Sequence, residues 1–222
     1  MLGTTRIAQP TLGSAKAMTQ APDLQAKKQP RQARAKATVE ALLDTAARLL
    51  ASEGYAAVTT NRVAELAGVS IGSLYEYFPN KEALVAAALA RALREIVAEV
   101  TLGLREALAR PDQPRGGIDH WMRAMVAALE QREALLRAAL REVPFLWSIS
   151  EVRELSNTLQ QVAQEGRYKS SRLVHFEDPE ASTYLLMSMV WSAILQAVLY
   201  RPPHLSRERL IHTLVEMVLK LL

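Results

Sequence analysis

The chain of 222 residues contains no cysteine, and this absence removes several kinds of site at once. Without thiols there is no disulfide framework, no thiol nucleophile and no cysteine-ligated zinc site. The histidines are scattered without the short spacings that metal ligands usually show (His120, His175, His204 and His212). We therefore expect no metal site and no cofactor, and a reducing cytoplasm is a compatible location.

Long apolar runs and strand-like alternation are lacking as well. No apolar run reaches the roughly 18 residues that indicate a membrane span. The longest candidate, Tyr184 to Tyr200, is interrupted by Ser188, Ser192 and Gln196. The N-terminus is polar and shows no secretory signal, so we expect no membrane association. Apolar and polar residues alternate nowhere along the chain, and this predicts an all-α fold.

The excess of positive over negative charge is small for the whole chain but large in its N-terminal region. The net charge is +4, yet residues 1–37 carry seven lysines and arginines against Asp23 alone. A basic tail beside a near-neutral body is typical of a chain that contacts a polyanion, although a solvated tail without a partner is the alternative. Residues 1–30 also lack periodicity and contain three prolines, which predicts disorder. Met18 is a second possible start.

Helical periodicity begins at Lys36. Apolar residues then recur at three- and four-residue steps until Gly54, as expected for an amphipathic helix (Val39, Leu42, Leu43, Ala46, Leu49 and Leu50). The stretch from Thr59 to Lys81 follows and predicts two short helices and the start of a third. Threonine 59 or 60, Ser70 and Asn80 are the predicted N-caps, and Gly68 is the predicted C-cap. This is the layout of a helix-turn-helix DNA-binding motif.

The rest of the chain predicts a helical body. The fourth helix is expected to run to about Arg110, and later helices are expected at 118–131, 133–142, 145–172, 179–200 and 206–221. Prolines separate them, as in the Asp178-Pro179 pair, which suits a helix start. We divide the chain into a basic arm (1–34), a DNA-binding domain (35–90, with the helix-turn-helix at about 59–78) and a body (91–222). We call the second part the reader.

Many residues of the reader match one known pattern in a single register: Thr59-Thr60, Val63-Ala64, Ala67-Gly68-Val69-Ser70, Gly72, Leu74-Tyr75, Tyr77-Phe78 and Lys81-Glu82. In these residues the chain resembles the TetR family of bacterial transcriptional regulators. The resemblance implies a helical body that binds an effector and a homodimer formed through the last two helices. It also implies a double-stranded, palindromic DNA operator, a cytoplasmic location and a regulator rather than an enzyme.

The predicted DNA contacts lie at the ends of the reader helices. Ser70, Ile71, Gly72 and Ser73 form the end of the third helix that would enter the major groove. Gly72 lets backbone approach DNA, Ser73 can bond a base edge or phosphate, and Ile71 can meet a thymine methyl or pack in the core. Other candidates are expected to contact phosphate or the DNA backbone: Thr60, Asn61, Arg62, Tyr75, Tyr77 and Lys81.

Two charged residues of the reader are unusual. Lys81 stands in the first turn of the fourth helix, where the helix dipole disfavours a cation. A bound phosphate would satisfy both the free backbone amides of that turn and the Lys81 amine. Glu76 lies near the predicted groove contact without an evident reason, and solvent exposure is the simplest interpretation.

The body contains the large adaptable side chains that suit a ligand pocket. The pocket candidates are Trp121, Met125, Phe145, Trp147, Tyr184, Met187 and Trp191, with ordinary core packing as the alternative. We thus predict a homodimeric repressor that a small, largely apolar effector releases from its operator. The alternatives are an all-α ligand-binding protein or enzyme with an incidental helix-turn-helix, and a sequence-blind nucleoid binder.

Overall fold

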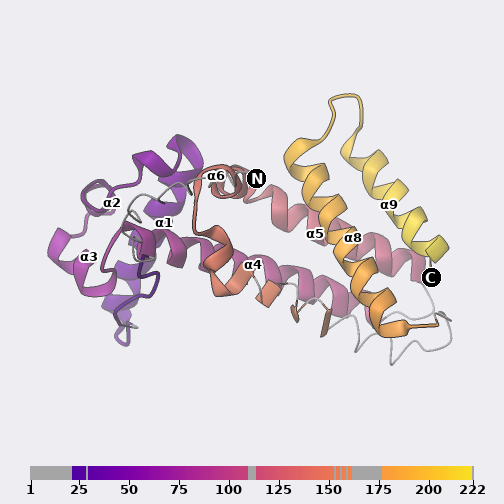
Figure 1. Cartoon of the computed structure of the whole chain (residues 1–222), viewed down its shortest axis with the longest axis horizontal. Helices are drawn as coiled ribbons and strands as arrows, with labels where there is room; N and C mark the ends of the chain where they lie inside the picture. The colour runs from indigo at the N-terminus through magenta and orange to yellow at the C-terminus, as the bar shows by residue number, and fades with distance from the viewer. Residues whose placement is uncertain are drawn as a thin grey trace, which may run out of the picture.

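A computed structural model describes residues 22–28, 30–109, 114–152, 154–155, 157–158, 160–161 and 177–221. Every regular element among these residues is a helix, so the predicted all-α fold is confirmed. Figure 1 shows that the reader occupies one end of an elongated molecule, while the C-terminal helices lie at the other end.

The reader begins with α1 (Ala33–Glu53), followed by the short 3₁₀ helix η1 (Tyr55–Ala57), α2 (Thr60–Leu66) and α3 (Ile71–Tyr77). The predicted caps are present. Thr59 Oγ1 accepts a hydrogen bond from the backbone N–H of Arg62 at 3.3 Å, and Ser70 Oγ accepts one from Ser73 at 3.1 Å. Each satisfies an N–H group that has no partner inside its own helix.

The turn between α2 and α3 is closed by Gly68, whose φ of +65° lies in the left-handed region. The backbone N–H of Gly68 bonds to Glu65 O at 3.1 Å, and that of Val69 bonds to Ala64 O at 2.9 Å. This pair of bonds is a Schellman motif, which requires the conformation that glycine adopts at little cost. The predicted role of Gly68 is therefore confirmed.

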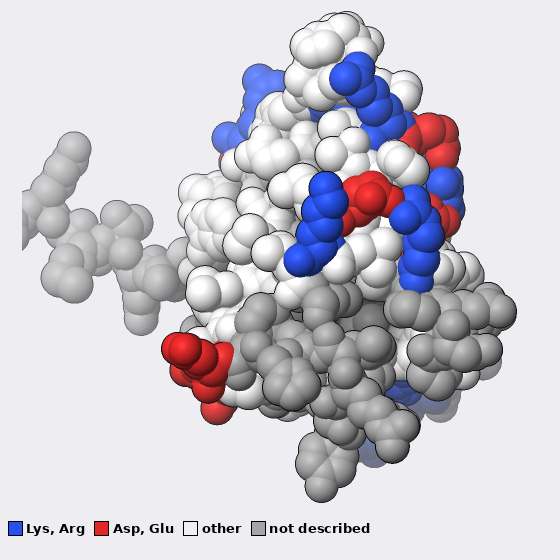
Figure 2. Space-filling model, turned by 90° about the vertical axis from the view of Figure 1, so that its right-hand side faces the viewer, with Lys and Arg blue, Asp and Glu red and all other residues white. Residues whose placement is uncertain are grey.

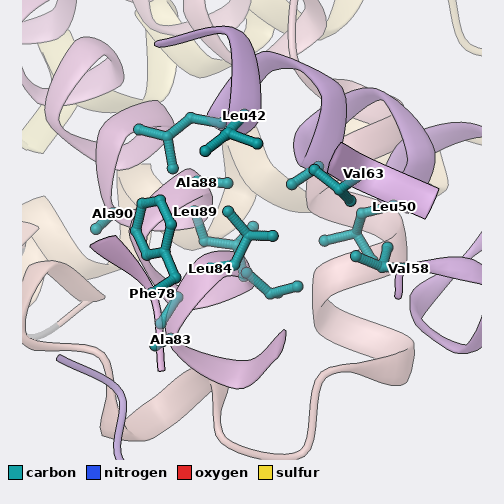
Figure 3. Packing of buried hydrophobic residues seen from close by; sticks show 14 of the residues in the cluster. Leu42, Leu50, Val58, Val63, Phe78, Ala83, Leu84, Ala88, Leu89 and Ala90 are labelled. Carbon is teal, nitrogen blue, oxygen red and sulfur yellow. The ribbon is translucent and has the colours of Figure 1, made fainter. Parts of the chain in front are cut away.

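The longest helix, α4 (Lys81–Leu108), belongs to both parts of the molecule. Its first turns close the reader core, where Leu84 and Leu89 pack among residues such as Leu42, Val63 and Phe78 (Figure 3). Its second half, from Leu93 to Leu104, packs in the core of the body. The predicted boundary at residue 90 falls inside this helix, so the reader and the body share one continuous helix instead of being joined by a linker.

The body contains α5 (Pro114–Glu130), α6 (Glu133–Glu142), η2 (Leu146–Ser148), α8 (Pro179–Tyr200) and α9 (Arg207–Leu221). Residues 150–161 are helical wherever the structure describes them. The single helix predicted for 145–172 is therefore wrong at its start, because Phe145 to Ile149 form a 3₁₀ turn and bend after Pro144. The end of that prediction lies outside the described residues.

Helix α8 is apolar but poorly covered. Its mean hydropathy of 1.5 over an 18-residue window would be enough for a membrane span, and only 22% of that window is buried. One such helix is weak evidence for a membrane, because the core helix of a soluble protein can have the same length and composition. Figure 2 shows the end of the body, where Lys, Arg, Asp and Glu side chains are scattered among uncharged residues. The exposed large hydrophobic residues of α8 include Tyr184, Leu185 and Met189. The body thus offers apolar surface that the described residues do not cover.

Candidate nucleic-acid interface

The N-terminal end of α3 is open to solvent. Ile71 is 40% exposed and Tyr75 is 42% exposed, while Leu74 on the opposite side is fully buried. A Cβ atom built on Gly72 would meet only Ser70 Oγ, at 4.0 Å. Neither φ nor packing within the described chain therefore requires glycine at position 72, and an alanine would favour the helix by about 1 kcal/mol. Residue 72 suits a surface that an external partner approaches closely.

Tyr75 and Thr60 link the two helices of the motif. The hydroxyl groups of these residues lie 3.1 Å apart in a hydrogen bond between α2 and α3. Asn61 is exposed in the first turn of α2, beside Thr60. The structure thus brings three of the predicted DNA-contacting residues, Thr60, Asn61 and Tyr75, to adjacent positions on the reader surface.

The serines at the start of α3 hold each other. Ser70 Oγ donates a hydrogen bond to Ser73 Oγ at 2.9 Å while it caps the helix. Both hydroxyls remain at the exposed end of α3, and each oxygen has a further lone pair to offer. They can therefore bond to an external partner that approaches this end of α3.

Arg62 is engaged by a carboxylate of α1. Its guanidinium lies 2.7 Å from Glu53 Oε1, and this hydrogen bond raises the pKa of Arg62 above its ordinary value. The pair is exposed, so the partners can exchange for others at little cost. A DNA phosphate would have to displace Glu53 in order to bind this cation.

Two predicted phosphate contacts do not fit the geometry. Tyr77 is only 8% exposed and packs in the reader core, with Lys28 Nζ 4.8 Å from its ring centroid. Lys81 turns inward, where its amine donates to the backbone O of Tyr55 at 3.1 Å and lies 3.8 Å from the centroid of the Tyr55 ring. The anion-like partner of Lys81 is therefore a carbonyl and an aromatic face inside the domain. In the chain without DNA, both residues thus have partners inside the domain.

A short N-terminal segment reaches the opposite end of α3. We call residues 22–28 the strap. The backbone N–H of Lys27 bonds to Tyr77 O at 2.8 Å, and Lys28 Nζ pairs with Glu76 Oε2 at 2.8 Å. The sequence reading missed this contact, because the strap has no helical periodicity and its partners lie 48 residues away. The pairing explains Glu76, which the sequence alone leaves without a role.

The predicted effector residues are separated. Trp121, Met125 and Met187 are buried in the body core, and Trp191 is half-buried there. Phe145 belongs to the reader core instead, 5.9 Å from the Tyr55 ring. Trp147 is 69% exposed and Tyr184 is 53% exposed, so neither lines an enclosed pocket. The described structure therefore does not bring these seven residues together in one place: four lie in the body core, one lies in the reader core and two are exposed.

Cavities do occur beside α4 and α6. One of about 460 Å³ lies between α4 and the side chains of Glu151, Glu154 and Thr158, and its α4 wall includes Val97, Thr101 and Leu102. Thr101 Oγ1 is buried without a hydrogen-bond partner among the described residues. A second cavity, of about 660 Å³, separates the end of α1 from α5 and α6. The described residues hold no cluster of three or more His, Asp or Glu side chains that could bind a metal ion.

The chain is similar to known regulators in its N-terminal part. Residues 42–88 match the family model described as bacterial regulatory proteins, tetR family. The HTH-type transcriptional repressor KstR of Rhodococcus jostii is 46% identical over 55 residues, which are 25% of this chain and 26% of the relative. KstR of Mycolicibacterium smegmatis is 41% identical over 58 residues, 26% of this chain and 28% of the relative. The match thus spans about a quarter of the length of these curated relatives.

Solved structures extend the likeness to the body. A bacterial regulatory protein in the tetR family from Rhodococcus RHA1 superposes with a TM-score of 0.59 at 20% identity, covering 83% of this chain and 96% of that protein. The fatty acid degradation regulator FadR from Bacillus halodurans gives 0.60 at 18% identity, covering 87% and 96%. At these identities the likeness shows a common fold. Residues 42–88 of this chain are thus similar to the DNA-binding part of the tetR family of bacterial regulatory proteins, and the helical body shares the fold of the solved regulators.

Proposed function

We propose that the chain is a sequence-specific DNA-binding repressor, located in the cytoplasm, and that the exposed N-terminal end of α3 reads the operator. The observation that carries this proposal is Gly72, an exposed helical glycine that nothing in the described structure requires. The DNA-contacting set consists of Thr60, Asn61, Arg62, Ser70, Ile71, Gly72, Ser73 and Tyr75. Side chains at the start of a recognition helix reach base edges, while flanking hydroxyls hold phosphate.

The proposed repressor acts as a homodimer. One seven-residue helix covers few base pairs, and two readers spaced by one turn of DNA would match a palindromic operator. The exposed apolar residues of α8 and α9 supply a surface for pairing: Tyr184, Leu185, Met189, Tyr200, Met217 and Leu221. Burial of such residues between two subunits would remove them from water, at about 25 cal/mol per Å².

The proposed effector is a small, largely apolar molecule that binds beside α4. The cavity of about 460 Å³ beside α4 has apolar walls at Val97, Ala98 and Leu102, and a buried hydroxyl at Thr101. A ligand there would favour one position of α4, whose first turn supports the reader through Lys81. Release from DNA then follows if the ligand binds the two positions of α4 with different affinity.

A sequence-blind nucleoid binder is the second candidate. The basic N-terminal region favours it, because lysines and arginines bind phosphate regardless of sequence. The named relatives are transcriptional repressors, and this supports a regulator over an enzyme with an incidental motif.

The deciding experiment selects DNA from a random pool with the full-length protein and then compares wild type with Gly72→Ala. We expect an enriched palindrome, bound at least tenfold more weakly by the variant. We also expect thermal stability to be unchanged or raised, because the helix gains a better former. A pool without enrichment would favour sequence-blind binding, and an unchanged operator affinity of the variant would remove Gly72 from the contact surface.

A further inference from the structure

The strap, residues 22–28, binds the C-terminal end of the recognition helix through the backbone and the side chain of Lys27. The backbone N–H of Lys27 donates to Tyr77 O at 2.8 Å, and its side-chain Nζ donates to Tyr75 O at 2.9 Å. The two accepting carbonyls belong to the last turn of α3, which ends at Tyr77. One strap residue therefore satisfies two carbonyl groups in that turn.

These carbonyls need an outside partner. The last four C=O groups of any helix lack an intrahelical donor, and α3 is only seven residues long, so they form a large part of its backbone. The C-terminal end of a helix also carries partial negative charge, which favours a nearby ammonium group. Lys27 supplies a donor and a positive charge at the same point. α3 has no basic residue of its own in its last turn.

Lys28 adds a second contact on the same turn. Its Nζ lies 2.8 Å from Glu76 Oε2 and 4.8 Å from the centroid of the Tyr77 ring. The ion pair is well exposed, with 51% and 58% of the two side chains accessible, so it adds little stability. Its effect is to orient the strap relative to α3. Tyr77 is buried in the reader core, and the Lys28 amine lies over its ring.

The near end of the strap is anchored to α4. Asn80 Nδ2 donates to Asp23 O at 3.1 Å, while Asn80 Oδ1 accepts from Ala83 N at 2.7 Å as the N-cap of α4. Leu24 is half-buried against the reader core. The strap thus spans from the start of α4 to the end of α3 and is held by main-chain, charged and apolar contacts.

We propose that the strap is a positioning element for DNA recognition: it holds the C-terminal turn of α3 and thereby fixes the angle at which the N-terminal end of α3 meets the groove. Lys27 and Lys28 act on the carbonyls and Glu76 of α3, and not on DNA phosphate. The proposal rests on the DNA-binding function proposed above. It assigns part of the basic N-terminal region to the support of the reader.

The test compares full-length wild type with Lys27→Met and Lys28→Gln. Hydrogen exchange of the DNA-free protein is followed in peptides that cover residues 22–28 and 71–78. We expect faster exchange in both peptides for Lys27→Met, and operator affinity reduced by roughly two- to fivefold, as for the loss of one exposed charged contact. The dependence of affinity on salt should keep the wild-type slope, because no phosphate contact has been removed.

A phosphate role predicts the opposite pattern and would overturn the proposal. In that case exchange in the free protein stays at the wild-type rate, and the salt slope falls by about one for each lysine removed. Thermal unfolding of each variant shows whether the fold is intact. Asn80→Asp provides a matched third variant, because its carboxylate still caps α4 but cannot donate to Asp23 O. We expect it to speed exchange in residues 22–28.

Failure of the proposed function gives a different result. If wild-type protein enriches no DNA sequence, the positioning role falls together with the operator, whatever the exchange rates. If wild type enriches an operator and Lys27→Met binds it as tightly as wild type, only the strap proposal falls.

Discussion

The backbone N–H of Tyr55 donates a hydrogen bond of 2.8 Å to Glu142 Oε2, so the last residue of α6 holds the first residue of the turn that follows α1. The Tyr55 hydroxyl bonds to Glu82 at 3.0 Å, and its ring packs against Phe145 and Lys81. One residue thus joins the reader to α4, to α6 and to the segment after α6. A shift of α6 in the body would reach the reader here.

Gly54→Ala should destabilise the fold far more than Gly68→Ala. Gly54 has φ +83° and ψ 174°, a region almost restricted to glycine, and an added Cβ would lie 3.1 Å from Glu142 Cδ and closer still to its oxygen. Gly68 has φ +65° and no atom within 4 Å of the added Cβ, so its change carries backbone strain of about 1 kcal/mol only. Urea unfolding should give a loss of roughly 3 kcal/mol for Gly54→Ala.

The double variant Gly54→Ala with Glu142→Ala separates the two parts of that loss. It removes the steric conflict but retains the backbone strain. Glu142→Ala alone already lacks the bond from Tyr55 N–H, so adding Gly54→Ala to it should cost less than adding Gly54→Ala to wild type. Equal losses for the two glycine variants would contradict the contact between Gly54 and Glu142.

Tyr55 should make stability depend on alkaline pH. Burial and the hydrogen bond to Glu82 raise the pKa of the Tyr55 phenol above its ordinary value. A raised pKa in the folded state means that this contribution to stability is complete below pH about 10 and is lost as the pH rises further. Tyr55→Phe should therefore be less stable than wild type at pH 8, and the difference should shrink above pH about 10. A difference independent of pH would contradict the buried phenol.

Arg91 should tie the reader to α4. Its guanidinium pairs with Glu40 and Asp44 of α1, and a third carboxylate, Glu95, lies 3.9 Å away. Replacing Arg91 with Met would leave Glu40 and Asp44 together without a cation, at a cost of about 1 kcal/mol after allowance for solvent screening. The loss should diminish in 1 M salt. Arg94→Met, which removes only the pairing with Glu151, is the matched control and should change stability less.

Met189→Glu should separate the subunits of the proposed homodimer. Met189 is 56% exposed on α8, so a charge is tolerated in a monomer but not in a buried apolar interface. Light scattering should show a shift from dimer to monomer at micromolar concentration, with operator binding strongly reduced. Glu180→Gln, in the first turn of the same helix, serves as a control that should stay dimeric. A dimeric Met189→Glu protein would place the interface elsewhere.

The sequence predicts the helices better than it predicts the surroundings of individual side chains. The predicted ranges 133–142 and 179–200 match α6 and α8, because prolines, caps and apolar periodicity are local signals. The partners of Tyr77 and Lys81 within the domain could not be predicted, because Lys28 and Tyr55 are distant in the chain. The place of Phe145 in the reader core could not be predicted either, because periodicity does not say which of two cores a residue joins.

The strap contacts α3 largely through backbone carbonyl groups of α3, which are present whatever the side chain. Of its contacts on that helix, those of Lys27 are to Tyr75 O and Tyr77 O, whatever side chains those residues bear. Positions 71, 72 and 73, which we propose to face the groove, lie at the other end of the helix. They can therefore be replaced without loss of the strap contacts. New operator preferences can then be selected in the laboratory, or arise by mutation, while the C-terminal turn of α3 stays supported in the same way.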